Sequence, residues 1–445
     1  MNLFRQLPKI DKLIADDSFK HLNRNILTKL AKKYIDNLRD KIKNNKIEEI
    51  NYSQIIEDLK KEYAQTLKPS LTPVINATGI TVHTNLGRSL IDESIYDSAK
   101  YVVCNYCNLE YDLDKGKRGD RYHHTTQALR ELLNCEDALI VNNNAAAVFL
   151  ILNTFAKDKE SIVSRGELVE IGGSFRVPDV MRESGTKLVE VGTTNKTKLS
   201  DYENAITQNT AIVMKVHKSN YTIEGFTQET DFSEISALAK EKNLIDYYDL
   251  GSGYIPRLSW GLSEAEPSIF KLLECNPSLI SFSGDKLFGS VQAGIIIGKK
   301  ELIDKLKTNQ LLRMFRVDKV TLALLEQTIL AYRTKKYEAI PTISMLNATV
   351  EELEKRAKSL AKNFKIDYEI KESKTYVGGG TMPNRKIPTV VIALNGDAVT
   401  LEKLFRANNI IGRIEDDKFV LDMRSLREKD FQQIIETVNE IPCKI

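Results

Sequence analysis

The stretch ALIVNNNAAAVFLILNTFA at residues 138–156 joins a short apolar run to an alanine-rich segment with helical spacing. An apolar run that stops at polar turn residues is typical of a buried strand, and the segment after it is typical of a helix. Similar apolar runs recur along the chain, at 161–167, 187–192, 210–216, 243–251, 278–284 and 293–298. Helical stretches lie between most of them, so we predict an α/β fold with a mostly parallel sheet.

The composition is that of a globular protein with several domains. The chain has 445 residues, of which 42% are hydrophobic and 28% are charged, which argues against disorder and coiled coils. No apolar run approaches the roughly 18 residues of a membrane span, and charges stand where a signal peptide needs an apolar core. We therefore expect a cytoplasmic protein with no membrane contact. The five scattered cysteines do not indicate a disulfide framework.

The pattern changes twice along the chain, which predicts three domains. Residues 1–70 have apolar positions at helical spacing and hold 15 Lys and Arg against 10 Asp and Glu, a net charge of +5. This basic segment could contact a polyanion, or could be a solvated helical face. Residues 71–334 carry the strand–helix alternation, and residues 335–445 read as a smaller C-terminal α/β domain.

The segment SLISFSGDKLFG at residues 278–289 holds the first candidate site residues. A predicted strand ends near Ser283, and Lys286 follows directly. A lysine at a strand end can form a Schiff base with a carbonyl cofactor, and a nearby serine hydroxyl can hold a phosphate. Taken alone, the segment is equally compatible with a surface lysine in a turn.

Two further segments complete the pattern. Asp249 ends the strand in YYDLGSG at 247–253 and could pair with the ring nitrogen of pyridoxal phosphate. Asn143, Asn144 and Ala145 begin a helix after a strand, where backbone N–H groups favour a phosphate. A turn aspartate and an asparagine helix cap are the alternatives. A phosphate cradle, an aspartate and a lysine in this order are typical of a pyridoxal-phosphate enzyme of fold type I, the aspartate-aminotransferase-like fold.

Three arginines are candidates for binding an anionic substrate. Arg88 lies in HTNLGRS, and Arg313 and Arg316 lie in LLRMFRVDK, and guanidinium groups suit oxyanions. Singly, each could be a surface residue. The histidines and cysteines lack metal-ligand spacing, so no metal is expected. No nucleotide-binding glycine motif is present, and we expect no DNA partner.

The amino-acid sequences of four segments closely resemble those of one protein family. They are NATGITVHTNLGRSLI (76–91), NLEYDLDKGKRGDRY (108–122), FSGDKLFGSVQAGIIIGKKELI (282–303) and RMFRVDKVTLALLE (313–326). Together they resemble bacterial selenocysteine synthase, the L-seryl-tRNA(Sec) selenium transferase family. The resemblance runs from about residue 3 to about residue 360.

The resemblance implies an activity and partners. Such an enzyme converts L-seryl-tRNA(Sec) to L-selenocysteinyl-tRNA(Sec) with selenophosphate and pyridoxal 5'-phosphate. It eliminates water and adds selenium through a dehydroalanyl intermediate. The family forms homo-oligomers, commonly decameric rings of dimers, in which the N-terminal domain contacts the tRNA.

The resemblance also implies residue roles. Lys286 stands at the cofactor-lysine position with Asp285 beside it, and Asp249 is retained. Arg88, Arg313 and Arg316 fall where the family places basic residues around the selenium donor. Thr193 and Thr194 lie in a region associated with contacts between dimers. One departure is Ser290 and Val291, which replace the Gly-Pro pair usual after the lysine.

Two other functions remain open from the sequence. A related pyridoxal-phosphate lyase could act on a small amino acid or sugar acid. A non-catalytic tRNA-binding protein would need neither Lys286 nor Asp249.

Overall fold

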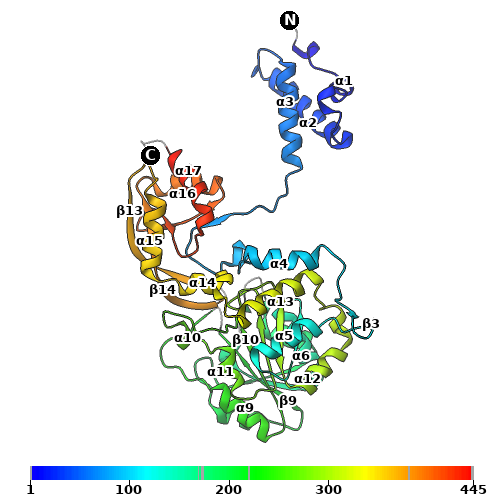
Figure 1. Cartoon of the computed structure of the whole chain (residues 1–445), viewed down its shortest axis with the longest axis vertical. Coiled ribbons are helices and arrows are strands. Elements are labelled where there is room, and N and C mark those ends of the chain that lie inside the picture. Colours follow the sequence, from blue (N-terminus) through cyan, green and yellow to red (C-terminus); the bar gives the residue numbers. More distant parts are fainter. Residues whose placement is uncertain (1–2, 169, 172–174, 219–220, 379–380, 442–445) are drawn as a thin grey trace. The chain divides into compact units, whose positions relative to one another are not determined.

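The protein consists of two compact units, each of which is described by itself. The computed structural model describes residues 3–168, 170–171, 175–218, 221–378 and 381–441. The units are Met1–Pro73 and Val74–Ile445. Figure 1 shows that the first unit is made of helices and that the second combines helices and strands. The domain limits predicted inside the second unit, 71–334 and 335–445, stay a prediction.

The N-terminal unit is a small helical bundle built from α1 (Ile10–Ile14), α2 (Arg24–Lys43) and α3 (Tyr52–Thr66). Asn23 and Asn51 cap α2 and α3 by accepting hydrogen bonds from backbone N–H groups of the first turn. The core contains Leu27, Ala31 and Ile35 of α2. Apolar residues spaced four apart pack at its margin: Leu22, Ile26, Leu30, Tyr34 and Leu38. The helical prediction for this segment is therefore confirmed.

The second unit is organised around a seven-stranded sheet with strand order β4-β12-β11-β10-β9-β5-β8. The strands are β4 (Asp137–Val141), β5 (Glu160–Ser164), β8 (Lys187–Val191), β9 (Thr210–Val216), β10 (Ile245–Gly251), β11 (Leu279–Ser283) and β12 (Gly294–Gly298). β12 is antiparallel to β4 and β11, and the other pairs are parallel. The mostly parallel α/β sheet predicted from the alternation is confirmed.

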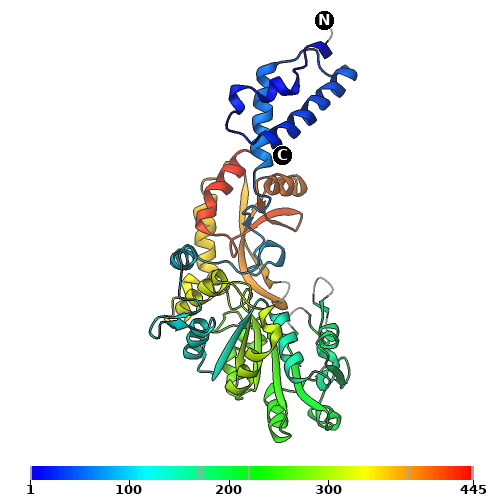
Figure 2. The same ribbon diagram turned by 90° about the vertical axis from the view of Figure 1, so that its right-hand side faces the viewer.

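Helices cover both faces of this sheet (Figure 2). α6 (Asn144–Phe155) contacts α7 (Val177–Glu183) and α12 (Lys300–Thr308), while α8 (Leu199–Ala205) contacts α9 (Phe232–Glu241). A third group is α4 (Glu93–Val103), α5 (His123–Leu133) and α13 (Lys319–Arg333). Because the crossovers are helical, the carboxyl ends of the parallel strands meet at one edge of the sheet.

The C-terminal part has its own antiparallel sheet, in the order β13-β14-β17-β16. Its strands are β13 (Tyr368–Gly378), β14 (Thr381–Leu394), β16 (Arg413–Glu415) and β17 (Lys418–Asp422). α15 (Val350–Ala361), α16 (Ala398–Ala407) and α17 (Phe431–Asn439) contribute buried residues to the same core. β1 (Ile75–Asn76) pairs in parallel with β15 (Ile410–Ile411), so Ile75 and Ala77 also pack in this core.

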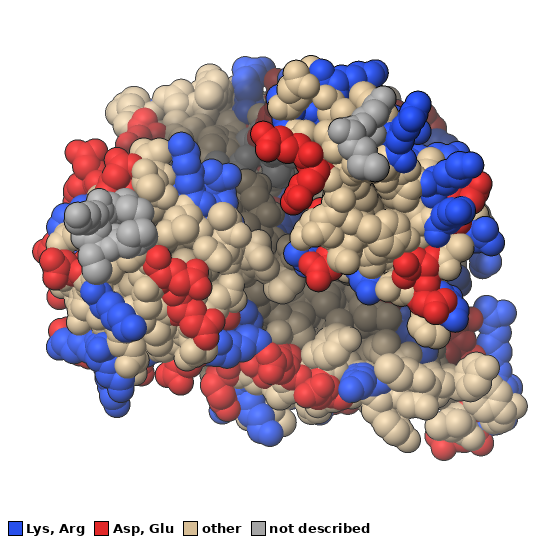
Figure 3. Space-filling view, turned by 90° about the horizontal axis from the view of Figure 1, so that it is seen from above, with Lys and Arg blue, Asp and Glu red and all other residues tan. Residues whose placement is uncertain are grey.

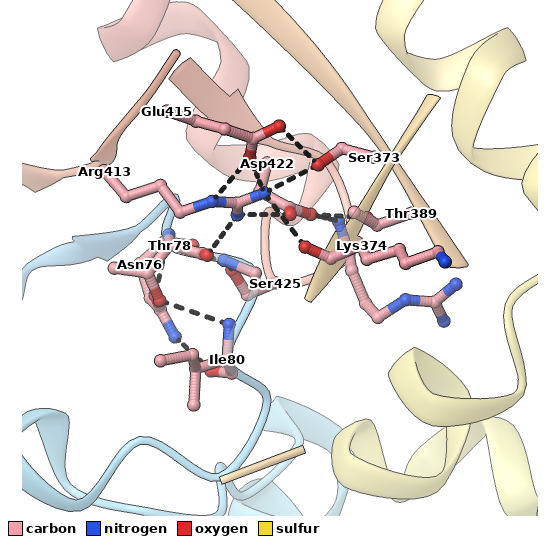
Figure 4. Close-up of polar contacts among 12 residues, drawn as sticks. Asn76, Thr78, Ile80, Ser373, Lys374, Thr389, Arg413, Glu415, Asp422 and Ser425 are labelled. Atoms are coloured by element: carbon pink, nitrogen blue, oxygen red, sulfur yellow. Dashed lines mark hydrogen bonds and ion pairs between the residues drawn. The ribbon is translucent and has the colours of Figure 1, made fainter. Parts of the chain in front are cut away.

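A buried polar cluster fastens the β1 segment to this sheet (Figure 4). Nη1 of Arg413 donates to Oδ2 of Asp422 at 2.5 Å and to the carbonyl oxygen of Thr78 at 2.6 Å. The other carboxylate oxygen of Asp422 accepts from Oγ1 of Thr389 at 2.6 Å. Asp422 is fully buried, so the ion pair compensates a charge that would otherwise be costly to bury.

The charges on the outer surface are mixed. Figure 3 shows Lys and Arg side chains interspersed with Asp and Glu over the face that it displays. Among the described residues, no helix is long and apolar enough to cross a membrane.

Candidate functional site

Lys286 lies in the turn that follows β11, at the carboxyl edge of the sheet. The turn is tied by hydrogen bonds from N of Gly289 to O of Lys286 and from N of Ser290 to O of Gly284. Burial is the largest cause that lowers the pKa of Lys286, and the charge of Arg88 lowers it further. Asp249, Asp285 and Glu266 act in the opposite direction. A lysine with a lowered pKa more readily loses its proton and becomes a nucleophile.

Asp249 lies near the end of β10, the strand beside β11, and is aligned with Ser281. Its carboxylate is buried, and Oδ1 accepts a hydrogen bond from Nδ2 of Asn144 at 2.8 Å. Burial raises the pKa of Asp249, while Asn144 and the charge of Lys286 lower it. A backbone hydrogen bond from Gly251 also lowers this pKa, so the carboxylate has polar partners that favour the charged form able to pair with a protonated ring nitrogen.

The start of α6 places three predicted residues beside Asp249. Asn143 caps the helix, because its Oδ1 accepts from N of Ala146 at 2.9 Å. Asn144 and Ala145 form the first turn, whose N–H groups have no acceptor within the helix. The amide oxygen of Asn144 is buried without a hydrogen-bond partner among the described residues. This helix end can therefore accept a phosphate, although the Asn143 side chain is already used as the cap.

Arg88 contacts the lysine turn directly. Its Nη1 donates to Oδ2 of Asp285 at 2.7 Å, and its backbone has a positive φ of 61°. The next residue, Ser89, donates from its backbone N to O of Asp285 and from Oγ to O of Lys286. The segment at 88–89 thus holds Asp285 and Lys286 in place and keeps a guanidinium group beside them.

The two other predicted arginines do not contact this group within the chain. Nη1 of Arg316 lies 3.7 Å from Oε1 of Glu110. Arg313 is exposed and forms no ion pair with a described residue. Their segment is attached to the α6 entry, because N of Asn142 donates to O of Phe315. The structure therefore gathers Arg88, Asn144, Asp249, Asp285 and Lys286, and among the described residues no hydrogen bond or ion pair joins Arg313 or Arg316 to them.

The two-residue departure after the lysine is accommodated locally. Ser290 is buried, and its Oγ lies 2.9 Å from Oγ1 of Thr328 on α13. This hydrogen bond satisfies the hydroxyl that replaces a glycine hydrogen. Lys286 keeps its place at the end of β11 with Ser283, which is buried as the last residue of that strand.

Two residues near the site were not predicted as functional. His217 follows β9, and its backbone N donates to O of Asp249 at 2.8 Å. Glu266 is fully buried, and the positive charge of Lys286 acts on its pKa. The sequence gives no functional signal for His217, because a lone histidine lacks metal-ligand spacing. Glu266 lies outside any periodic pattern, so the sequence offered no sign of its burial.

The site fits a carbonyl cofactor that carries a ring nitrogen and a phosphate. Lys286 supplies the amine, Asp249 a buried carboxylate, and the start of α6 the phosphate-binding N–H groups. Polar atoms on Asn144, His217 and Glu266 are buried without hydrogen-bond partners among the described residues. Buried polar atoms are normally paired, so the Asn144 oxygen indicates where a ligand could supply a donor, while the His217 and Glu266 atoms lie 3.8 Å from each other.

Comparisons with known proteins agree with this geometry. The family described as L-seryl-tRNA selenium transferase matches residues 74–427. The L-seryl-tRNA(Sec) selenium transferase of Nautilia profundicola is 61% identical, over 100% of this chain and 99% of that relative. The relative of the same name from Sulfurimonas denitrificans is 56% identical, over 99% of both chains. The solved structure of D-glucosaminate-6-phosphate ammonia-lyase has a TM-score of 0.61 at 19% identity, covering 85% of this chain and 97% of that one, and shares the fold.

Proposed function

The chain belongs to the L-seryl-tRNA selenium transferase family, and we propose that it converts L-seryl-tRNA(Sec) to L-selenocysteinyl-tRNA(Sec) with selenophosphate. The observation that carries the proposal is the position of the half-buried Lys286 near Asp249 and the Arg88–Asp285 pair, at the carboxyl ends of two neighbouring strands. The overall fold is that of pyridoxal-phosphate enzymes of fold type I.

Pyridoxal 5'-phosphate is the proposed cofactor, and the described residues provide places for its three polar parts. When bound, it supplies a carbonyl that links to an amine and a ring that takes up electrons from a carbon losing a proton. Lys286 would hold the carbonyl carbon, and Asp249 the ring nitrogen. Asn144, Ala145 and Ser283 would hold the phosphate, with Asn143 keeping the helix start in position.

Proton transfer is assigned to Lys286. Because burial lowers the pKa of this lysine, a neutral amine can take the proton from the α-carbon of the seryl group. Burial raises the pKa of Asp249, but the Asn144 amide that donates to Oδ1 and a backbone hydrogen bond from Gly251 favour its ionised form. An ionised Asp249 would keep a proton on the ring nitrogen of a bound cofactor.

The net reaction replaces a hydroxyl by selenium. The serine hydroxyl leaves with a proton as water, and the selenium of selenophosphate forms a bond to the β-carbon. A water molecule then adds to phosphorus as the phosphorus–selenium bond breaks, which releases phosphate and leaves the selenol. Both the donor and the released phosphate are anions, which guanidinium groups bind well. We assign Arg88, Arg313 and Arg316 to this anion, since Arg88 already lies beside Lys286 and Arg313 has no ion pair among the described residues.

We also propose a separate role for each of the three predicted domains. Residues 1–70 would bind the tRNA, residues 71–334 would bind the cofactor, and residues 335–445 would form the small domain. The net charge of +5 on residues 1–70 suits a phosphate backbone. We further propose a homodecamer built as a ring of dimers, with Thr193 and Thr194 near the contacts between dimers.

The test is conversion of seryl-tRNA(Sec) in the presence of selenophosphate and pyridoxal phosphate. We expect borohydride to fix the cofactor on Lys286 in the purified protein. Lys286→Ala should lose both the fixation and the conversion. Lys300→Ala is the matched control, because Lys300 is exposed and paired with Asp304, and it should keep both.

The alternatives give different results in the same assay. A protein that binds no pyridoxal phosphate would contradict the proposal and favour a tRNA-binding function without catalysis. Cofactor fixation without preference for tRNA(Sec) over tRNA(Ser) would favour a lyase that acts on a small amino acid.

A further inference from the structure

His217 and Glu266 form a buried pair that has no part in the steps assigned above. Nδ1 of His217 lies 3.8 Å from Oε2 of Glu266. Both atoms are buried and have no hydrogen-bond partner among the described residues. Two unpartnered polar atoms that face each other require an explanation, since buried polar groups are normally hydrogen-bonded.

Both residues are attached to the end of β10, which carries Asp249, or to the residues directly after it. The backbone N of His217 donates to O of Asp249 at 2.8 Å. Oγ of Ser252 donates to Oε1 of Glu266 at 2.5 Å, and the hydroxyl of Tyr254 donates to O of Glu266 at 2.7 Å. These contacts orient the carboxyl group so that Oε1 is occupied and Oε2 faces the imidazole.

The surroundings favour neutral forms of both side chains. Burial raises the pKa of Glu266 to about 7 and, as the largest cause, lowers that of His217 to about 4. The groups that act on the pair are Lys286, Lys215, Lys218 and Glu229, with the Tyr248 and Tyr254 hydroxyls nearby. An imidazolium–carboxylate pair would bury two charges here. A protonated Glu266 beside a neutral His217 buries no charge.

We propose that Glu266 carries a proton and donates it from Oε2 to Nδ1 of His217, which fixes the imidazole as the tautomer with its own proton on Nε2. Hydrogen bonds of this kind are often long before a ligand is bound and shorten in the complex. Glu266 is thus a positioning residue that acts through His217. His217 presents an N–H donor beside Asp249 and Lys286, for an oxygen of the cofactor or the substrate.

This role rests on the proposed function, because a fixed donor is useful only if a ligand occupies the site. The proton itself can be detected without turnover. A protonated buried carboxyl group has a carbonyl stretch that an ionised carboxylate lacks, and infrared difference spectra between pH 6 and pH 8 report it in the full-length holoenzyme.

Three variants separate the proposal from a purely structural role. Glu266→Gln keeps a donor toward Nδ1, because the amide oxygen can replace Oε1 as the acceptor for Ser252. Glu266→Ala removes the donor. Glu264→Gln is the matched control on α10 (Leu262–Ala265), since Glu264 is exposed and forms an ion pair with Arg257 at 3.6 Å.

We expect the wild-type spectrum to contain a carboxyl band that titrates near pH 7, that persists in Glu264→Gln and that is absent in Glu266→Gln. If Glu266 must be protonated, wild-type kcat/KM should fall about tenfold from pH 6 to pH 8 through this group. Glu266→Gln should not show that decrease, while keeping wild-type activity at pH 6 within about twofold.

Two results would overturn the proposal. One is a wild-type spectrum without a carboxyl band assignable to Glu266. The other is a Glu266→Gln variant that is as impaired as Glu266→Ala, or that keeps the wild-type decrease with pH. If Glu266→Ala does not fold, Glu266→Gln and the infrared spectra decide the question. A protein that shows the band but does not convert seryl-tRNA(Sec) would contradict the proposed function and leave the proton assignment standing.

Discussion

Gly79 is the position at which a single methyl group should most clearly damage the C-terminal part of the fold. A Cβ built on Gly79 would lie 2.3 Å from Oδ2 of Asp422 and 2.6 Å from Oγ1 of Thr375. The φ of Gly79 is +85°, a conformation that side chains rarely adopt. Gly79→Ala therefore strains the backbone and also pushes the Asp422 carboxylate away from Arg413.

The two effects can be given separate magnitudes. The left-handed backbone should cost roughly 1–2 kcal/mol. Disrupting a buried ion pair costs about 3–5 kcal/mol when one charge is left without its partner. Asp422 is fully buried and Arg413 is mostly so, so we expect Gly79→Ala to lose roughly 4–7 kcal/mol of unfolding free energy.

The matched control is Gly225→Ala. Gly225 has a φ of +102° with open space around it, so this variant should show the backbone effect alone. Unfolding in urea can be followed by the fluorescence of Trp260, the single tryptophan. Its Nε1 donates to O of Leu346, and its ring lies 5.7 Å from the guanidinium of Arg424 in the C-terminal part. If both variants lose equal stability, the Arg413–Asp422 pair does not hold the β1 segment as argued.

Three further predictions concern the site and the N-terminal unit. Arg313→Ala should lower selenium transfer about 10²-fold without weakening cofactor binding, because Arg313 has no contact with the lysine turn. Arg88→Ala should impair both selenium transfer and cofactor binding, since Arg88 is bound to Asp285. If the two variants lose selenium transfer and cofactor binding to the same extent, the separate roles of Arg88 and Arg313 are refuted. The raised pKa of Glu266 means that the folded state binds a proton which the unfolded state releases above its ordinary pKa of 4.5. Wild type should therefore lose about 3 kcal/mol of stability relative to Glu266→Gln between pH 4.5 and pH 7, as measured by urea unfolding at each pH. Deleting residues 1–70 should abolish tRNA(Sec) binding in a filter assay and leave cofactor fixation unchanged, because those residues pack in their own core.

The central sheet could be predicted because its strands are buried on both faces and appear as uninterrupted apolar runs. β13 could not be predicted, because it lacks such an apolar run. Its sequence YEIKESKTYVG is rich in charged and polar residues, and most of its side chains are exposed or half-buried. The pairing of β13 with β14 depends on tertiary contact, which a local pattern does not contain. The antiparallel direction of β12 follows from its short connection to β11, which is too short for a helical crossover.

The site shows the same limit. Lys286 and Asp249 could be predicted to meet, since the carboxyl ends of neighbouring parallel strands lie together. The contact between Asn144 and Asp249 could not, because an asparagine at a helix start is equally suited to a cap, as Asn143 shows. The burial of Glu266 could not be predicted either, since it depends on tertiary contact with the segment that contains Ser252.

The proton on Glu266 has a consequence for Lys286 that connects these observations. Asp249, Asp285 and Glu266 each favour the charged form of the lysine. Arg88 neutralises Asp285 through the 2.7 Å ion pair, and Asp249 is needed as an anion. If Glu266 were also ionised, a second uncompensated carboxylate would favour the ammonium form and oppose the effect of burial on the pKa. A neutral Glu266 removes that opposition, so the same proton that orients His217 also helps Lys286 to remain a free amine. Replacing Glu266 with Asp, which keeps the acid and retracts it by one methylene, should weaken both effects together, whereas independent changes in the His217 tautomer and the Lys286 pKa would show that they are not coupled.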